Sequence, residues 1–296
     1  FYRRAAAERA GDCAPEEVEF LDAAIRGLLA VRRIAEKFGR AAEMRLAECG
    51  DPAERNRLEW IAQTAPEVPW RGARTFREGL ACLWFLHEIC ASIEGVGMSV
   101  VGHLDRCLGD LYREDVAAGR LTPEEAYDWV ARLLLHTDCR VDNRAPVDAC
   151  FNRQEQGDTL ILGGCDADGN AICNDVTFLV LRAHRDLGLI YPKIHCRIGA
   201  ATPRPLLDAA NRDFLTGRNV ISFLNDDALI PAQVKAGKSL ADARGYVAGG
   251  CWETIVEGCE HSAGANCYFN LARIMDLSIH DSAAVTAVTK DVYRTI

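Results

Sequence analysis

The sequence predicts a mixed α/β fold in which a helical N-terminal part leads into a parallel sheet or barrel. Apolar residues follow a helical period over residues 16–136, whereas from about residue 158 short apolar runs of strand length alternate with segments of helix length. The chain has 296 residues, 49% of them hydrophobic and 26% charged, which is typical of a globular protein with a sizeable core.

The helical part is clearest in three segments. Apolar side chains recur at helical spacing over residues 20–31 and again over residues 80–90. Thr122 precedes Pro123 and two glutamates, so a hydroxyl cap, a first-turn proline and carboxylates near the positive helix end predict a helix to about His136. Breaks are expected near residues 95–97 and 144–146.

The second half of the chain contains three predicted strands, at residues 159–162, 193–198 and 220–224. Helices are predicted between and after them, beginning near Asn174, Thr202, Asn225 and Ser239. Strands separated by helices of this length favour parallel pairing, because a parallel connection needs a crossover segment. No repeat or long linker interrupts the chain, so residues 1–296 are predicted to form one incomplete catalytic domain. About 1–150 would be mostly helical, and about 151–296 would be half of a β/α barrel.

Composition excludes several classes of protein. The formal charge is −9 and the basic residues are scattered, which argues against a nucleic-acid partner. The longest apolar runs are too short to cross a bilayer, so no membrane association is expected. The thirteen cysteines include no pair with zinc-site spacing, so no metal site is predicted. Free thiols in a reducing cytoplasm are expected, most of them acting as small buried apolar residues.

The most unusual segment is the loop around Cys251. Two glycines allow a tight turn, and in an extended chain residues two apart point to the same side, so Cys251 and Glu253 would be neighbours. Burial would raise the pKa of Glu253 and suit it to proton transfer near neutral pH. A carboxylate beside a thiol disfavours the thiolate, which leaves room for sulfur chemistry that does not begin from the anion. The alternative is a buried cysteine beside a surface glutamate.

Three other constellations are weaker. A cysteine–histidine nucleophile using His261 or His280 would need an oxyanion site, of which the sequence has no signature. Cys259 and Cys267 follow Cys251 at intervals of eight residues, without the tight turn that would gather metal ligands. Residues 166–170 resemble the start of a calcium loop but lack its closing glutamate, so a polar turn is expected there.

Short motifs in order along nearly the whole chain resemble the glycyl radical enzymes, the pyruvate formate-lyase-like family. The motifs that carry this resemblance are Phe76–Leu80, Gly102–Asp105, Tyr112–Asp115, Leu121–Ala126, Pro192–Ile198, Ser222–Asp227, Ala243–Tyr246, Gly250–Glu253 and Phe269–Ala272. The resemblance implies a ten-stranded α/β barrel made of two five-stranded halves, with the cysteine loop inside it.

The resemblance also implies roles and partners. Cys251 matches the cysteine that becomes a thiyl radical and takes a hydrogen atom from a small-molecule substrate, and Glu253 matches a catalytic base. No cofactor is bound directly. A radical S-adenosylmethionine iron–sulfur activating enzyme installs the stored radical on a backbone glycine near the C-terminus of the family's proteins, which are commonly homodimers.

The chain begins with Phe1 rather than Met, so it is expected to be a fragment. Its last glycine is Gly264, so the glycine-bearing loop near the C-terminus is expected to be missing from it. A truncated chain, a separate glycyl radical domain and a degenerate copy are the alternatives. This isolated chain is therefore expected to be inactive.

The residues around Cys251 indicate which reactions of the glycyl radical enzyme family the chain resembles most. Position 250 is glycine, whereas pyruvate formate-lyase has adjacent cysteines there, so acetyl transfer is disfavoured. A Gly-Cys-x-Glu motif resembles the eliminating members, which implies dehydration or C–N or C–S cleavage of a small hydroxylated substrate. Arylacetate-type decarboxylation and formate acetyltransferase-like activity are the enzymatic alternatives. A catalytically inactive barrel fragment that binds a small molecule or partner is the alternative from another class.

Three further residues are predicted to contact the substrate. Asp105 either faces the substrate or caps local backbone groups. Asn225 lies where a predicted strand ends, at the barrel rim where substrates bind, although it also suits a helix cap. Ser222 lies on the same strand.

Overall fold

The computed structural model describes residues 1–92, 100–138, 158–249, 253–260 and 270–280. The chain forms two compact units, residues 1–260 and residues 261–296. In its described part the second unit consists of helix α11 (Leu271–His280) and the residue before it. The prediction of a single domain over the whole chain is not tested by this division.

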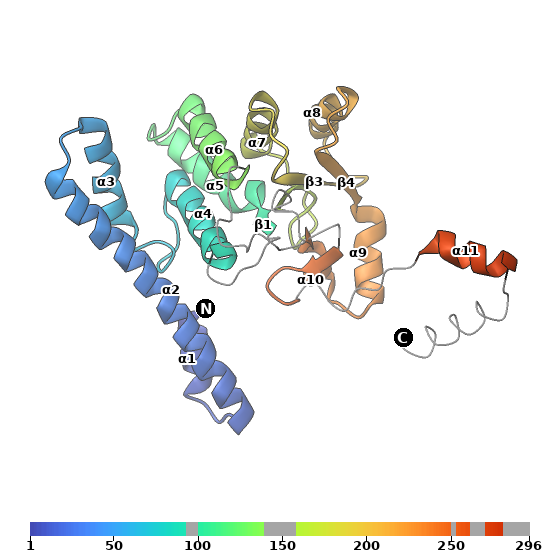
Figure 1. Ribbon diagram of the computed structural model, residues 1–296, viewed down its shortest axis with the longest axis horizontal. Helices are drawn as coiled ribbons and strands as arrows, with labels where there is room; N and C mark the ends of the chain where they lie inside the picture. Colours follow the sequence, from blue (N-terminus) through green and yellow to red (C-terminus); the bar gives the residue numbers. More distant parts are fainter. Residues whose placement is uncertain (93–99, 139–157, 250–252, 261–269, 281–296) are drawn as a thin grey trace. The chain divides into compact units, whose positions relative to one another are not determined.

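The N-terminal part of the first unit is helical, as predicted. Its helices are α1 (Tyr2–Arg9), α2 (Pro15–Glu48), α3 (Pro52–Thr64) and α4 (Phe76–Ser92). The long helix α2 packs against both α1 and α3 (Figure 1). Helix α3 begins where the Asp51 carboxylate accepts hydrogen bonds from the backbone N–H groups of Ala53 and Glu54, at 3.3 and 3.2 Å.

A sheet of four parallel strands follows, in the order β1-β2-β3-β4. The strands are β1 (Val100–His103), β2 (Thr159–Gly163), β3 (Lys193–Ile198) and β4 (Ile221–Asn225). The helices around them are α5 (Leu104–Ala117), α6 (Pro123–Asp138), α7 (Asp175–Asp186), α8 (Arg204–Leu215), α9 (Asp226–Lys235) and α10 (Leu240–Arg244). A mixed α/β fold with a parallel sheet is therefore confirmed.

The predicted helix starts are also confirmed, and all but that of α8, which follows Pro203, have a side-chain cap. Thr122 and Glu125 cap each other's backbone N–H groups at the start of α6. Asn174 accepts hydrogen bonds from the backbone at the start of α7, and Ser239 does so before α10. The turn at residues 166–170 is built by Asp166, whose carboxylate accepts hydrogen bonds from the backbone N–H groups of residues 168 and 170.

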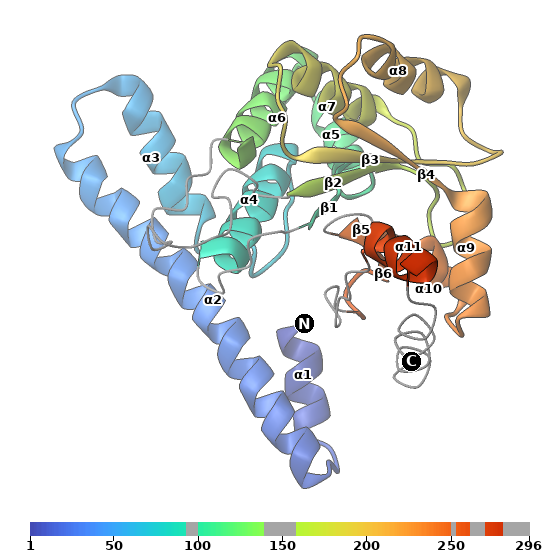
Figure 2. The same ribbon diagram turned by 45° about the vertical axis from the view of Figure 1, so that its right-hand side comes forward.

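The two faces of the sheet have different neighbours. Leu160, Ile194 and Ile221 are partners in register and lie in the main core with side chains of α5, α6, α7 and α8. In Figure 2 these helices lie on one side of the sheet and the β5–β6 hairpin lies on the other. The second face, called the inner face below, carries Ile161 and Leu224, which pack against the hairpin. Burying each such aliphatic side chain contributes about 1.5–3 kcal/mol.

Two elements differ from the sequence prediction. Val100–His103 forms strand β1 within a stretch predicted to be almost wholly helical. The segment around Gly249 forms an antiparallel hairpin of β5 (Tyr246–Gly249) and β6 (Glu253–Val256). Both elements have four-residue strands, which are too short for a hydrophobic period to show, and their glycines indicated only a break in the chain.

The nine cysteines in the described ranges are all free thiols, as predicted. The expectation that most of them are buried is wrong for these nine, because only Cys196 is buried and the others are half-buried or exposed.

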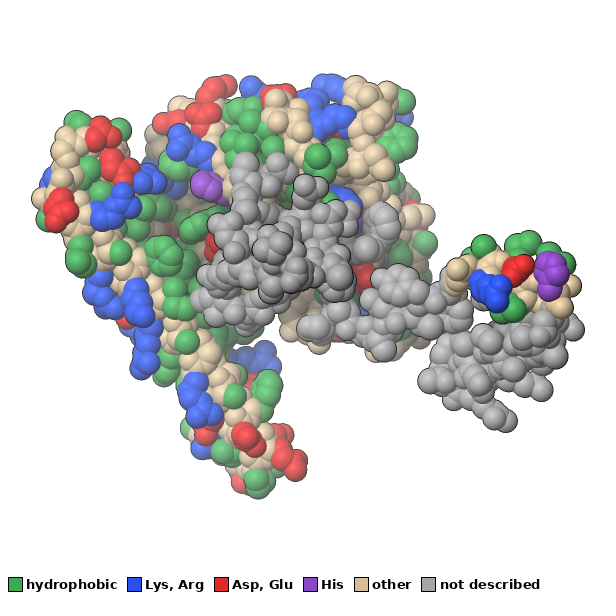
Figure 3. Space-filling model, in the orientation of Figure 1, with side chains coloured by type: hydrophobic (Ala, Val, Ile, Leu, Met, Phe, Trp, Pro, Cys, Tyr) green, Lys and Arg blue, Asp and Glu red, His purple; other side chains and the backbone are tan. Residues whose placement is uncertain are grey.

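Figure 3 shows Lys and Arg side chains spread over the visible face with Asp and Glu side chains among them. Within the described part of the chain, no helix has the length and apolar character needed to cross a membrane.

Arg77 in α4 links the N-terminal helix α3 to α6. Its guanidinium carbon lies 3.9 Å from the ring centroid of Trp60 in α3 and 4.3 Å from that of Trp129 in α6. Arg77→Lys keeps the charge but loses the planar group between the rings, so we expect a loss of about 1 kcal/mol in the free energy of unfolding.

Urea unfolding measures this effect. Arg71→Lys is the matched control, because Arg71 lies on the surface in an ion pair with Glu67 and should change stability little. Equal stability of the two variants would contradict the role given to Arg77.

Candidate active site on the inner face

The segment that contains the predicted catalytic pair is the β5–β6 hairpin. Gly249 and Glu253 are register partners, and Gly249 is buried. Cys251 lies outside the described residues. Glu253 opens β6 and is exposed, whereas the argument for proton transfer from the sequence assumed burial. The catalytic roles of both residues stay predictions.

The hairpin is held to the inner face by buried polar contacts. The Tyr246 carbonyl accepts hydrogen bonds from His103 Nε2 at 3.1 Å and from Arg197 Nη1 at 3.3 Å. The Thr159 hydroxyl donates to the Ala248 carbonyl at 3.1 Å. The first strand of the hairpin therefore crosses β1, β2 and β3 with its backbone fixed at both ends.

The second hairpin strand is held from α9. The side-chain amide of Gln233 donates to the carbonyl and the hydroxyl of Thr254, at 3.1 and 2.7 Å. Gln233 and Asp226 are the two buried residues of α9. Since Thr254 follows Glu253 directly, this contact fixes the backbone beside the predicted base.

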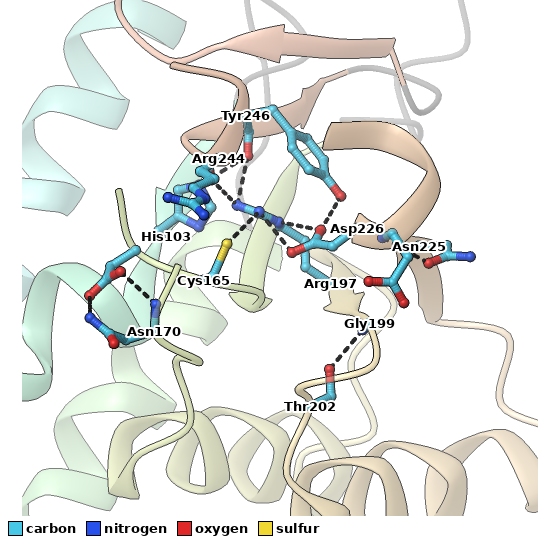
Figure 4. Close-up of polar contacts among 12 residues, drawn as sticks. His103, Cys165, Asn170, Arg197, Gly199, Thr202, Asn225, Asp226, Arg244 and Tyr246 are labelled. Carbon is cyan, nitrogen blue, oxygen red and sulfur yellow. Dashed lines mark hydrogen bonds and ion pairs between the residues drawn. The ribbon is translucent and has the colours of Figure 1, made fainter. Parts of the chain in front are cut away.

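A buried ionic cluster lies where β3 and β4 end (Figure 4). Arg197 is fully buried and donates two hydrogen bonds of 2.9 Å to the Asp226 carboxylate. Its third nitrogen donates to the carbonyl of Arg244 at 2.8 Å, and its guanidinium lies 4.0 Å from the ring centroid of Tyr246. The Tyr246 hydroxyl donates to Asp226 at 2.7 Å. Each buried charge therefore has several partners, as its removal from water requires.

The cluster also changes proton affinities. Burial lowers the pKa of the Arg197 guanidinium, but the bonded carboxylate of Asp226 outweighs it, so the pKa is raised and the cation is retained. Burial and the same carboxylate raise the pKa of Tyr246. The site is thus a fixed ion pair with a neutral phenol.

Two glycines allow β2 to end against this cluster. Gly163 and Gly164 have φ angles of 74° and 76°, a region that side chains disfavour. A Cβ on Gly164 would lie 2.6 Å from Arg197 Nε, and one on Gly163 would lie 2.8 Å from the Arg197 carbonyl oxygen. Glycine is therefore required at both positions, by the backbone conformation and by the close approach of Arg197.

A pocket of about 310 Å³ opens beside the cluster, and small side chains form much of its wall. It is lined by Gly164, Cys165, Gly169, Ala171, Gly199, Ala201, Thr202, Asp226, Asp227, Ile230, Pro231, Leu240 and Arg244. Within the described ranges, no three His, Cys, Asp or Glu side chains gather as metal ligands.

Asp105 is completely buried near the start of α5 and is surrounded by protein donors. Its carboxylate accepts hydrogen bonds from the Gly163 backbone N–H at 2.8 Å, the Thr177 hydroxyl at 2.9 Å and the Arg106 backbone N–H at 2.9 Å. Burial raises the pKa of Asp105 from its usual 3.8 to about 6, although these hydrogen bonds oppose the rise. Its contacts tie α5 to β2 and α7, and its role toward a substrate stays a prediction.

The structure does not bring the three predicted substrate contacts together. Ser222 is half-buried on β4 and is the register partner of His195, next to the inner-face residues Ile161 and Leu224. Asn225 is exposed and accepts a hydrogen bond from the backbone N–H of Asp227 at 3.0 Å, so it caps α9 as its sequence position allowed. Of the three, only Ser222 lies on the face that the hairpin covers.

Sequence reasoning assigned no site role to Arg197, Asp226 or Tyr246. The signal was present, because Arg197 interrupts an apolar strand and a buried arginine needs a carboxylate partner. The first acidic residues after the next strand are Asp226 and Asp227. Which of them would turn inward follows from the register between β3 and β4, and the sequence does not determine that.

Asp226→Asn tests the cluster. The change leaves Arg197 buried without a counter-charge, so we expect a loss of about 3 kcal/mol in the free energy of unfolding, together with faster amide exchange in β5. Tyr246→Phe is the milder matched change, because it removes one hydroxyl contact worth about 1 kcal/mol. Guanidinium unfolding and hydrogen exchange provide the measurements. Similar losses in the two variants would contradict a dominant ion pair.

Asp105 gives a prediction about pH. Because its folded pKa of about 6 lies above the unfolded 3.8, the folded protein binds more protons between these values. Stability contributed by this group is therefore fully present below pH 4 and falls by about 3 kcal/mol as pH rises through 6, at about 1.36 kcal/mol for each unit between the two pKa values.

Asp105→Asn removes this titration, so the difference in unfolding free energy between parent and variant should change across pH 4–7. The exposed Asp208→Asn is the control. A parent–variant difference that does not vary with pH would exclude the effect.

Comparisons with known proteins show which family this chain is similar to. Residues 3–290 match the family model for "Pyruvate formate lyase-like" proteins. The chain is 26% identical over 274 residues to an isethionate sulfite-lyase of Nitratidesulfovibrio vulgaris, covering 90% of this chain and 32% of that protein. It is 27% identical to trans-4-hydroxy-L-proline dehydratase of Clostridioides difficile, covering 84% of this chain and 31% of that protein.

Solved structures give the same result. The glycerol-bound B12-independent glycerol dehydratase of Clostridium butyricum superposes with a TM-score of 0.83 at 25% identity, covering 94% of this chain and 36% of that one. The chain therefore spans about a third of the length of the curated relatives and solved structures that it matches. Since the family model matches nearly from end to end, the chain belongs to the pyruvate formate lyase-like family, that is, to the glycyl radical enzymes.

Proposed function

We propose that this chain is the part of a glycyl radical lyase that carries the hydrogen-abstracting Cys251 and the base Glu253. The substrate would be a small hydroxylated molecule from which the enzyme eliminates water, an amine or sulfite. Relatives whose names describe a sulfite-lyase, a hydroxyproline dehydratase and a sulfopropanediol dehydratase support elimination. The Gly-Cys-x-Glu sequence supports it as well.

The observation that carries the proposal is the seating of the β5–β6 hairpin. Tyr246, Val247 and Ala248 are at most 3% exposed and pack against Ile161 and Leu224 of the sheet. A sulfur-centred radical must be kept from water and oxidants, so a buried strand on the inner face that ends two residues before Cys251 in the sequence suits that chemistry. Glu253 begins the returning strand, with its backbone beside the Gln233–Thr254 contact.

The proposed reaction begins with hydrogen-atom transfer. The Cys251 sulfur radical takes a hydrogen atom from the carbon that bears the hydroxyl, so an S–H bond forms and a C–H bond breaks. Glu253 takes the hydroxyl proton, and the resulting ketyl radical expels the neighbouring leaving group with its bonding electron pair. The product radical then recovers a hydrogen atom from the Cys251 thiol, which restores the sulfur radical.

The glycyl radical supplies the first unpaired electron when the glycine-bearing segment is present. That segment, either in the same polypeptide or in a separate domain, and a radical S-adenosylmethionine activating enzyme are the proposed partners. Association as a homodimer is proposed with them. Decarboxylation of an arylacetate and a barrel with no reaction of its own are the competing outcomes that the experiment separates.

Cys251→Ser and Glu253→Gln test the proposal in the full-length protein after anaerobic activation. Cys251→Ser should retain the glycine-centred electron paramagnetic resonance signal and lose turnover, because serine forms no comparable radical. Glu253→Gln should lower kcat by about 10²–10⁴-fold, the usual contribution of a general base. Product analysis distinguishes elimination from decarboxylation.

Two nearby residues serve as matched controls. Cys259→Ser changes an exposed thiol, and Glu257→Gln changes a carboxylate whose partner is Arg106. Both variants should keep full turnover. Unchanged turnover in Cys251→Ser would overturn the radical assignment, whereas absence of any radical signal in the parent would support a non-catalytic barrel.

A further inference from the structure

One row of residues crosses the inner face of the sheet at a single level. His103, Ile161, His195 and Ser222 are successive register partners on β1, β2, β3 and β4. Register partners in a parallel sheet point to the same face, and Ile161 belongs to the cluster that the hairpin covers. The row therefore presents two imidazoles and a hydroxyl to the interior on which the hairpin lies.

His195 is a buried histidine whose ring lacks a hydrogen-bond partner in the described ranges. It is 1% exposed, and among the residues that the structure describes neither of its ring nitrogens has a hydrogen-bond partner. A buried polar group without a partner destabilises a folded protein, so such a group calls for an explanation. His184 provides the contrast, because this equally buried histidine bonds to the Pro192 carbonyl at 3.0 Å.

His103 repeats the pattern in part. Its Nε2 donates to the Tyr246 carbonyl, which makes Nδ1 the acceptor nitrogen of a neutral ring. That Nδ1 is buried and has no partner within the described part of the chain. Two imidazoles in one row thus keep unused hydrogen-bonding capacity toward the same interior.

The row is uncharged at neutral pH. Burial, helped by the charge of Lys193, lowers the pKa of His195 to about 4. Burial also lowers the pKa of His103 to about 3. A neutral imidazole offers one donor and one acceptor, and the Ser222 hydroxyl offers both, which matches the needs of an alcohol better than those of a carboxylate.

We propose that His195 and Ser222 form a subsite that holds a hydroxyl group of a small polyol substrate. The inference rests on the proposed function, since it places the substrate's hydroxyl on the face that carries the hairpin. Adjacent strands are about 4.8 Å apart, so one hydroxyl oxygen between the two side chains can bond to both. The unpaired ring is then explained as a group whose partner is the ligand.

Stability without ligand is the first test. His195→Leu replaces an unpaired polar ring with an apolar side chain of similar size, so the melting temperature of the ligand-free chain should rise by about 2–4 °C. His184→Leu is the matched control and should lower the melting temperature, because it leaves the Pro192 carbonyl without its donor. A fall in both variants would show that His195 has a structural partner and would overturn the proposal.

Binding is the second test. Titration of propane-1,2-diol, followed by the imidazole NMR signals, should give a saturable shift of His195. His195→Leu and Ser222→Ala should each raise the dissociation constant about tenfold or more, the effect of losing one buried hydrogen bond. His195→Gln retains a donor and an acceptor and should bind more tightly than His195→Leu. Equal affinity of parent and His195→Leu, or no rescue by glutamine, overturns the subsite.

This measurement separates the inference from the proposed function. Equilibrium binding needs no radical, so weakened diol binding in His195→Leu would support the subsite even if Cys251→Ser proved the reaction wrong. Conversely, turnover that depends fully on Cys251 would support the lyase function. If diol affinity were then unaltered in His195→Leu, the proposed subsite would be wrong while the lyase function would stand.

Discussion

The buried pair of Arg197 and Asp226 is the constraint on which the inner face depends. Two charges removed from water lose several kcal/mol of solvation, which only well-formed hydrogen bonds can offset. Arg197 meets this demand with a bidentate contact to Asp226 and two backbone carbonyls, and Tyr246 adds its hydroxyl and its ring. Satisfying one charge therefore fixes the end of β3, the start of α9 and the first residue of the hairpin.

The hairpin follows from this arrangement rather than from its own strength. A two-stranded hairpin with four-residue strands is marginal by itself in water. Here Thr159 holds the Ala248 carbonyl and Gln233 holds Thr254, so each strand is fixed by a different neighbour. The two strands that flank residues 250–252 in the sequence are thereby held by separate contacts, and the proposed hydrogen-atom transfer requires preorganisation of this kind.

The sequence predicts those helices and strands that are determined by residues close together in the chain. The caps at Thr122 and Asn174 marked two helices, and runs of branched apolar residues marked three strands. Strand β1 and the hairpin could not be predicted in this way, because four residues do not show a period. The contacts of Asp105 and Arg197 were equally hidden, since their partners lie tens of residues away and depend on register.

The polar groups of the inner face fall into two kinds, and the difference between them is informative. Where the strands end, protein atoms compensate the charges of Arg197 and Asp226, so this cluster has a structural role and needs no ligand. Two residues before Arg197 on the same strand, His195 keeps both ring nitrogens unpaired within the described residues. The unpaired imidazole is therefore best understood as capacity kept for a molecule that the chain does not itself contain.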